Sequence, residues 1–298
     1  MSKYKITVFT PTFNRKHTLS RLYKSLREQT YTDFEWLVID DGSTDDTEAM
    51  IKNWMAEKNP FPIYYHYKEN GGKHTAINLG LDKAQGDLFF TADSDDFLTK
   101  DALEKVNVWA ESLPKNELFC GVVGNWGHTA DETPNTVFAG EWRDANLLER
   151  YPDVSKVPID GERAYVFFTK IHRKYKYPEF EDEKFMTEAV AWNRMGNDGY
   201  KMRVFNDIIY IYKFLPNGLT LSGSKMFIDN PKSYGLWLKE KAEFCKFGYF
   251  KKFMNYYSYF STQKNKLSTK EIAANIGAPT IVIFLISVLF SLKRILHR

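Results

Sequence analysis

Clusters of acidic and small polar residues near the start of the chain have the residue types needed to bind a phosphorylated ligand. The densest is Asp93-Ser94-Asp95-Asp96, which follows an apolar run at 88–90. Hard divalent cations prefer oxygen ligands from one or two carboxylates together with phosphate oxygens. Two carboxylates separated by one residue, on a turn after a buried strand, can hold such a cation against a diphosphate. An acidic turn at a helix start would have the same composition, because the helix dipole favours aspartate there.

Three further segments carry groups suited to a nucleotide. Residues 40–43 offer carboxylates that can accept hydrogen bonds from a base N–H or a ribose hydroxyl, and Gly42 permits close backbone approach. Residues 10–14 would leave backbone groups free at the exit of a strand. In residues 70–73, two glycines precede a helix and leave backbone N–H groups and a lysine for an anion. Each segment on its own is also compatible with an ordinary loop or capped turn.

The elements that would position these segments alternate between strands and helices. Apolar and β-branched runs predict strands, and helical patterns predict helices between them. The strands are expected at 4–10, 34–40, 63–67 and 88–92, and the helices at 18–29, 44–57 and 73–84. Repeats of this length indicate a parallel sheet covered by helices. Ligands of such sheets bind beyond the carboxyl ends of the strands, where the polar segments lie.

The composition is that of an ordinary globular protein, with 43% hydrophobic and 27% charged residues over 298 positions. Its charge is uneven, because residues 1–200 contain 25 Lys/Arg and 33 Asp/Glu, whereas residues 201–298 contain 16 and 5. The excess of positive charge at the end predicts an anionic partner, either anionic lipid or nucleic acid. Cys120 and Cys245 are too few for a disulfide framework or a metal cluster and are predicted to be free thiols.

Taken together and in this order, the four polar segments resemble the family 2 glycosyltransferases, which have the GT-A fold. The resemblance runs from TVFTPTFNR through LVIDDGSTDDT and NGGKHTAINLG to FFTADSDD. It continues at lower density in residues 185–194, and residues 165–220 look closest to members that build bacterial surface polysaccharides. The implied fold class is α/β: a Rossmann-like, mixed and mostly parallel sheet flanked by helices, with a helical, apolar C-terminal extension.

The resemblance implies a role for each matching residue. Glu188 falls on the family's catalytic acid and would take the proton of the acceptor hydroxyl. Asp95, with Asp93, would bind Mn²⁺ or Mg²⁺. An arginine that many members carry is Ile77 here, and Lys73 is the expected substitute for its charge. The nucleotide sugar would be bound by Thr10, Pro11, Thr12, Asn14, Asp41, Lys73, Asn78, Asp93 and Ser94.

The implied function is inverting, metal-dependent transfer of a hexose or N-acetylhexosamine from a nucleotide diphosphate sugar, with a UDP-sugar favoured. The acceptor would be a hydroxyl of a glycan or lipid-linked saccharide. A catalytic domain is predicted at 1–222, with a nucleotide-binding half (1–110) and an acceptor half (111–222). Residues 223–298 would form a basic, aromatic helical region. Two alternatives stay open: a sugar nucleotidyltransferase, and a catalytically silent, membrane-attached binding protein of the same fold.

The last part of the chain predicts contact with a membrane surface. Residues 272–292 contain no charged side chain and are long enough to span a hydrocarbon core, although Gly277 and Pro279 interrupt the run. Lysines alternate with aromatic residues through 225–270, as suits a membrane interface. The N-terminal MSKYKITVFT has a strand pattern without the apolar core of a signal peptide. The expected location is the cytoplasm, at the inner face of the cell membrane, and nucleic acid is not an expected partner.

Overall fold

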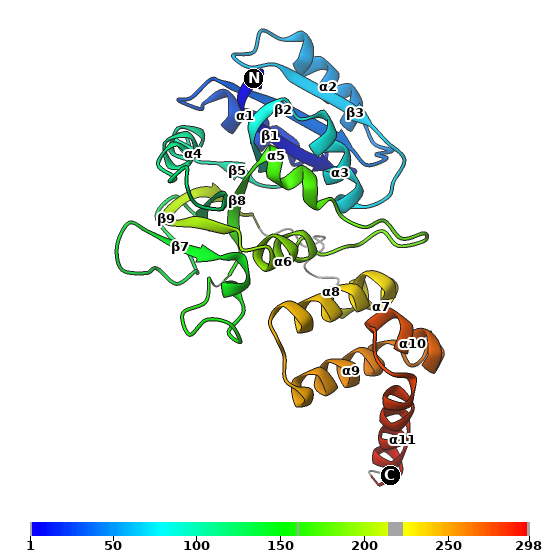
Figure 1. Cartoon of the computed structure of the whole chain (residues 1–298). Helices are drawn as coiled ribbons and strands as arrows, with labels where there is room; N and C mark the ends of the chain where they lie inside the picture. Colours follow the sequence, from blue (N-terminus) through cyan, green and yellow to red (C-terminus); the bar gives the residue numbers. More distant parts are fainter. Residues whose placement is uncertain (1, 160, 214–222, 297–298) are drawn as a thin grey trace.

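The computed structural model describes residues 2–159, 161–213 and 223–296, which form a sheet flanked by helices and a group of C-terminal helices (Figure 1). The first third of the chain alternates strands with helices as the sequence predicts, and β2 and β3 lie at the predicted residues. These elements are β1 (Tyr4–Thr12), α1 (Leu19–Arg27), β2 (Phe34–Asp40), α2 (Thr47–Ala56), β3 (Ile63–Tyr67), α3 (Lys73–Lys83) and β4 (Gly86–Thr91).

The first four strands are parallel neighbours in the order β3-β2-β1-β4. Thr12 at the end of β1 is paired with Asp40 at the end of β2, and Phe9 is paired with Thr91 at the end of β4. The carboxyl ends of these strands therefore lie along one edge of the sheet, and the polar loops that follow them meet there.

Apolar side chains cover both faces of this parallel sheet. On one face, Ile6 and Val8 of β1 pack in one cluster with Leu22 of α1. On the other face, Phe9 of β1 packs in a second cluster with Ile77 of α3. Strands buried on both faces have continuous apolar patterns instead of alternating ones, because every side chain meets a covering layer.

The remaining strands extend the sheet with mixed directions. β8 lies antiparallel between β4 and β6, and β9 is parallel to β6 and antiparallel to β5 and β7. The predicted mixed α/β sheet is thus confirmed, and its parallel pairs are concentrated in the first four strands. The strands are β5 (Phe97–Leu98), β6 (Phe119–Gly127), β7 (Trp142–Asn146), β8 (Arg163–Phe168) and β9 (Lys201–Ile211). The helices are α4 (Ala102–Glu111), η1 (Leu147–Arg150), α5 (Thr169–His172), η2 (Arg173–Tyr175) and α6 (Ala189–Asn197).

The C-terminal helices pack around an apolar cluster of their own, which includes Tyr259 and Ile283. Helix α8 connects this group to the sheet. Glu183 accepts hydrogen bonds from the first N–H groups of α8, and Arg194 of α6 makes a bidentate ion pair with Glu240. The helices are α7 (Ser224–Asp229), α8 (Pro231–Phe244), α9 (Tyr249–Gln263), α10 (Thr269–Ile276) and α11 (Thr280–Leu296).

The predicted apolar segment 272–292 is not one continuous helix. Helix α10 ends at Ile276, Gly277 adopts a left-handed conformation with φ of 67°, and α11 begins after Pro279. Glycine suits this turn, because residues with a side chain rarely adopt a positive φ. Over the described residues, no helix is both long enough and apolar enough to cross a membrane.

Candidate active site

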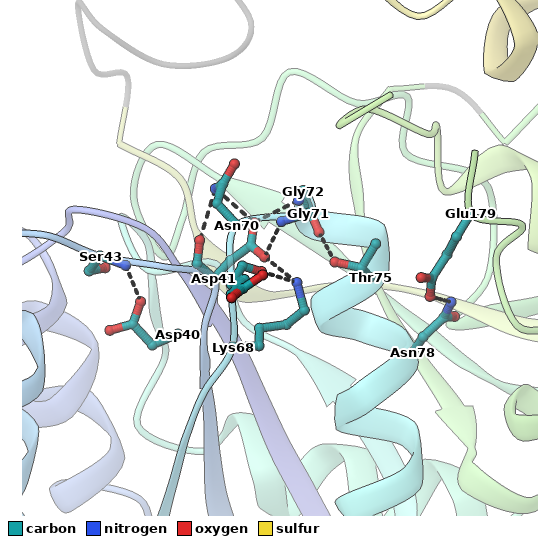
Figure 2. A network of polar contacts seen from close by, with 11 residues as sticks. Asp40, Asp41, Ser43, Lys68, Asn70, Gly71, Gly72, Thr75, Asn78 and Glu179 are labelled. Atoms are coloured by element: carbon teal, nitrogen blue, oxygen red, sulfur yellow. Dashed lines mark hydrogen bonds and ion pairs between the residues drawn. The ribbon is translucent and has the colours of Figure 1, made fainter. Parts of the chain in front are cut away.

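Asp41 holds the loop after β3 against the end of β2. Its carboxylate accepts hydrogen bonds from Lys68 Nζ (2.7 Å) and from the side-chain amide of Asn70 (3.1 Å). It also accepts from the backbone N–H groups of Gly71 (3.0 Å) and Gly72 (2.7 Å), as Figure 2 shows. The Asp41 side chain is only 6% exposed. A carboxylate with this many donors is fixed in place, and it fixes the two glycines that lead into α3.

Gly72 allows a second segment to approach this loop closely. Its φ is 94°, and a Cβ atom at this position would lie 1.9 Å from the carbonyl oxygen of Lys184. Only glycine fits both this backbone conformation and this contact. The chain around Lys184, which leads into α6, is therefore held beside the start of α3 although it is distant in sequence.

Lys73 joins two carboxylates from these separate segments. Its Nζ lies 2.8 Å from Asp93 Oδ1, after β4, and 2.8 Å from Glu188 Oε1, before α6. Because both carboxylate oxygens lie 2.8 Å from the same nitrogen, the distance between the two oxygens is at most twice that value. Burial lowers the pKa of Lys73, but the charges of Asp93 and Glu188 outweigh it and hold the pKa well above its usual range. We call Lys73, Asp93 and Glu188 the Lys73 cluster.

The acidic segment after β4 has the chemistry of a cation site. The backbone N–H of Asp93 donates to the hydroxyl of Tyr210 (2.8 Å), and the Asp93 side chain is 38% exposed. Burial and the negative charge of Asp93 raise the pKa of Asp95, and they raise the pKa of Asp96 to about 7. Carboxylates crowded together resist ionisation, and a bound cation reverses that effect.

The donor set fits a divalent ion that is shared with a ligand. Among the described residues, no three His, Cys, Asp or Glu side chains are placed to hold a metal ion by themselves. A Mg²⁺ or Mn²⁺ ion that also binds a diphosphate needs only one or two carboxylates. Asp93 and Asp95 meet that requirement, since both offer carboxylate oxygens at a strand end and Asp93 already contacts a cation.

Glu188 lies immediately before α6, and 28% of its side chain is exposed. Lys73 holds it opposite Asp93. A partly exposed carboxylate in this position is able to accept a proton from a hydroxyl group bound beside it.

Glu162 is a further acidic residue near the Lys73 cluster that the sequence did not reveal. It immediately precedes β8, and β8 pairs with β4 so that Val166 is opposite Phe90. Continued toward the start of β8, this register brings Glu162 to the level of the acidic segment after β4. The pKa of Glu162 is raised, first by loss of hydration and then by the negative charge of Glu188. No motif surrounds Glu162, and only the pairing of β8 with β4 shows where it lies.

Thr10 and Asn14, two predicted nucleotide-binding residues, use their side chains within the protein. Thr10 is fully buried, and its hydroxyl accepts a hydrogen bond from Trp36 Nε1 (3.0 Å). The Asn14 side chain accepts from the backbone N–H of Thr44 (2.8 Å), and the Asn14 N–H donates to Ser43 Oγ (2.8 Å). These contacts secure the loop after β1 to the loop after β2, and a direct contact with a nucleotide stays a prediction.

Pro11, Thr12 and Ser94 are buried at the same edge of the sheet. Within the part of the chain that the structure describes, Thr12 Oγ1 has no hydrogen-bond partner. Because buried hydroxyl groups are normally paired, a polar ligand group at this edge would complete the hydrogen bonding of Thr12.

Asn78, another predicted nucleotide-binding residue, uses its side chain within the protein, and a contact with the nucleotide sugar stays a prediction. Its amide oxygen accepts from the N–H of Tyr177 (2.8 Å), and its amide nitrogen donates to the carbonyl of Tyr177 (2.9 Å) and to Glu179 (2.8 Å). Figure 2 shows the contact with Glu179. Asn78 therefore fixes the chain after η2. Residues 214–220, the end of the segment that resembles polysaccharide-building members, lie outside the described residues.

Comparison with known proteins gives relatives that match most of this chain. The family model described as "Glycosyl transferase family 2" matches residues 7–176. A curated relative from Campylobacter jejuni, the GalNAc(5)-diNAcBac-PP-undecaprenol beta-1,3-glucosyltransferase, is 26% identical over 96% of this chain and 94% of its own length. The glycosyltransferase GlyA of Streptococcus pneumoniae is 35% identical over 71% of this chain and 30% of its own length.

Solved structures share the fold at lower sequence identity. TarS 1–349 of S. aureus in complex with UDP matches with a TM-score of 0.57 at 18% identity, over 90% of this chain and 76% of that chain. The mannosyltransferase PcManGT from Pyrobaculum calidifontis, in complex with GDP-Man and Mn²⁺, has a TM-score of 0.57 at 16% identity, over 99% and 80%. These likenesses show the fold alone.

Proposed function

The chain belongs to glycosyl transferase family 2, and from this premise we propose that it carries out inverting, metal-dependent transfer of a sugar from a nucleotide diphosphate sugar to an acceptor hydroxyl. That it is a glycosyltransferase follows from its family and its named relatives. The observation that carries the finer proposal is the Lys73 cluster, in which Asp93 and Glu188 both lie 2.8 Å from one nitrogen. In this proposal Asp93 binds the metal ion and Glu188 faces the acceptor, and the two carboxylates are close enough to act on one sugar ring.

The donor we propose is a UDP-sugar bound at the edge formed by β1, β2 and β4. Asp41, Thr12 and the backbone of residues 10–14 border the nucleotide in this proposal, and Lys73 faces the diphosphate. TarS was solved with UDP, and PcManGT with GDP-Man and Mn²⁺. A Mn²⁺ or Mg²⁺ ion held by Asp95 and Asp93 would neutralise the diphosphate as it leaves.

Glu188 is the proposed base. In an inverting displacement the acceptor oxygen attacks the anomeric carbon on the side opposite the departing diphosphate. The hydroxyl proton passes to Glu188 as the new C–O bond forms and the bond to the diphosphate breaks. Lys73 fixes Glu188 opposite Asp93 before substrate binds, which limits the reorganisation that the reaction requires. No covalent sugar–enzyme intermediate is formed.

The acceptor we propose is a glycan or a lipid-linked saccharide, in the synthesis of a surface polysaccharide. The C. jejuni relative, which matches this chain along nearly its whole length, is named for transfer to an undecaprenol-linked saccharide. We place the enzyme at the cytoplasmic face of the cell membrane, with a catalytic domain at 1–222 and a C-terminal region at 223–298. A sugar nucleotidyltransferase and a silent binding protein gain no support from relatives that are named as glycosyltransferases.

Glu188→Gln tests the proposed base, because it keeps the shape of the side chain and removes its ability to take a proton. We expect kcat for transfer to fall about 10²–10⁴-fold. Binding of UDP in the presence of Mn²⁺, followed by calorimetry, should stay close to that of the wild type. The release of nucleoside diphosphate, not pyrophosphate, identifies the reaction as transfer.

Glu48→Gln is the matched control for this test. Glu48 also lies at the start of a helix and pairs with a lysine, Lys52, at 2.6 Å, but it is outside the proposed site. It should retain full activity. Near-normal turnover by Glu188→Gln would exclude Glu188 as the base.

A further inference from the structure

Helix α11 is apolar both on the side that packs against the protein and on the opposite, exposed side. From Thr280 to Leu292 the helix contains no charged residue. Ile283 and Ile286 are fully buried in the cluster formed by the C-terminal helices. Phe290 continues this inner side, with its ring 5.8 Å from Tyr257 and 5.9 Å from Phe260 of α9. These contacts account for one stripe of the helix.

The opposite stripe is exposed and equally apolar. Its members follow one another at intervals of three, one, three, one and three residues, which places them on a single side of an α-helix. We call this stripe the outer face of α11. It consists of Ile281 (63% exposed), Phe284 (54%), Leu285 (53%), Val288 (40%), Leu289 (52%) and Leu292 (50%). Surface helices of globular proteins normally carry polar residues on this side, and a contiguous apolar surface marks a binding site.

The net charge of the C-terminal region favours an anionic surface as the partner. Residues 223–298 contain 13 Lys/Arg and 4 Asp/Glu, a net charge of +9. The start of α9 adds exposed aromatic side chains beside two lysines: Tyr249 is 96% exposed and Phe250 79%, and Lys251 and Lys252 follow them. Aromatic and lysine side chains gather at the boundary between lipid head groups and acyl chains.

Two other roles of the outer face of α11 fit these observations less well: contact with a second copy of the chain, and passage of α11 across a membrane. Two copies meeting through this face would bring together two regions that each carry +9, whereas a bilayer with anionic lipid attracts that charge. Helix α11 has 17 residues, and no helix among the described residues is able to cross a membrane. Helices α9 and α11 lie at the end of the molecule opposite α2 and β3 (Figure 1), and among the described residues α11 packs chiefly against α9 and α10.

We propose that the outer face of α11 docks this protein on the surface of an anionic bilayer. The helix lies in the plane of the membrane, and its outer face enters roughly 5–10 Å into the boundary between head groups and acyl chains. This proposal deepens the membrane location stated under the proposed function. It does not depend on catalysis, because lipid binding requires neither a donor nor an acceptor.

Binding of the full-length chain to sedimented vesicles tests the proposal. Vesicles of phosphatidylglycerol and phosphatidylethanolamine supply the anionic surface, and vesicles of phosphatidylcholine the neutral one. The test variant Phe284→Gln/Leu289→Gln removes apolar side chains of the outer face without changing charge, and Ile281→Gln/Leu285→Gln repeats the change at two further members. The matched control is Val108→Gln/Leu118→Gln, because Val108 and Leu118 are each 58% exposed and lie far from α11 in sequence.

The wild type and the matched control should bind anionic vesicles equally well and neutral vesicles at least about tenfold more weakly. Both outer-face variants should lose at least about tenfold in affinity for anionic vesicles, with unchanged circular dichroism and unchanged transfer to a water-soluble acceptor. A wild type that stays in the supernatant with anionic vesicles would overturn the proposal. So would a wild-type dimer in light scattering that both outer-face variants convert to a monomer. Loss of transfer in the wild type with intact vesicle binding would count only against the proposed function.

Discussion

Lys73 makes two charge-assisted contacts, with Asp93 and with Glu188, that a neutral side chain cannot replace. If the same ammonium group also meets the diphosphate of the donor, Lys73→Ala should weaken binding of a UDP-sugar. We expect a loss of about 10–100-fold, which corresponds to one charged hydrogen bond. Calorimetric titration with the donor in the presence of Mn²⁺ measures it.

Lys105→Ala is the matched control for Lys73→Ala. Lys105 also bridges two carboxylates, Asp101 at 2.9 Å and Asp207 at 3.1 Å, but none of the three belongs to the proposed site. Equal donor affinities of Lys73→Ala and Lys105→Ala would contradict a role for Lys73 in donor binding.

Asp95 is the second residue whose role can be isolated. Asp95→Asn keeps the size of the side chain and removes its charge, so that Asp93 and the diphosphate are left to bind the metal ion. We expect Mn²⁺ binding in the presence of UDP, measured by electron paramagnetic resonance, to weaken at least about tenfold. Transfer should slow as well. Asp101→Asn provides the control, and an unchanged Mn²⁺ affinity of Asp95→Asn would remove Asp95 from the metal site.

Among the secondary-structure elements, the short helix α5 buries an imidazole group without polar partners. His172 is 2% exposed and lies against the rings of Phe89, Phe167 and Tyr177. Within the described part of the chain neither of its ring nitrogens has a hydrogen-bond partner. Burial lowers the pKa of His172 to about 3. The folded protein therefore keeps this histidine neutral at pH values where the unfolded chain protonates it.

This difference makes the stability depend on pH. A histidine in the unfolded chain takes up its proton near a pH of about 6.5, so the unfolded chain binds more protons between that value and the folded pKa. The stabilising contribution of keeping His172 neutral is fully present above a pH of about 6.5. It falls as the pH drops below that value, by up to about 1.4 kcal/mol per pH unit. Urea denaturation from neutral pH to about pH 5 should show a smaller decrease for His172→Leu than for the wild type. His17→Leu, at an exposed position, is the control, and parallel curves for His172→Leu and the wild type would argue against this account.

The strands and helices of the parallel sheet were predictable because β1, β2 and β4 are largely buried on both faces, and because β1, β2 and β3 are each followed by a helix. The predicted strands 34–40 and 63–67 coincide with β2 and β3, and the predicted helix 73–84 ends one residue beyond α3. The placement of β8 between β4 and β6 was not predictable. Antiparallel strands that pair with distant partners leave no mark on the local pattern of residues.

The candidate active site was also predictable only in part. The acidic segment after β4 was found from its residue types and spacing, and Glu188 from the resemblance to a family; the structure brings Asp93 and Glu188 together. Their connection through Lys73 was not predictable, because it depends on the close contact between Gly72 and the backbone of Lys184. Backbone contacts between distant segments have no signature in either segment alone.

In the whole molecule, the C-terminal helices are joined to the sheet through a charged pair of low exposure. The Arg194 and Glu240 side chains are 28% and 13% exposed. Removal of one partner leaves the other partly buried and unpaired, which is more damaging than loss of an exposed pair. For Glu240→Gln we expect a decrease of about 1–3 kcal/mol in the free energy of unfolding, measured by urea denaturation.

The exposed pair between Lys201 and Glu117 supplies the control. Both side chains are more than two-fifths exposed, and Glu117→Gln should change the free energy of unfolding by less than about 0.5 kcal/mol. The double variant Arg194→Met/Glu240→Leu should recover most of the loss, since it leaves no unpaired charge. If Glu240→Gln is as stable as Glu117→Gln, the pair does not secure the C-terminal helices.

The contact of Gly72 with Lys184, together with the pairing of Asn78 with Tyr177, has a consequence for hybrid enzymes. A chimera that takes its donor preference from one parent and its acceptor preference from another should therefore not be joined between residues 72 and 184. The stretch 177–184 has to be inherited with the loop before α3, because a parent with any side chain at position 72 would not admit it. Within the proposed acceptor half, recombination between relatives is thereby restricted to the sequence that follows this stretch.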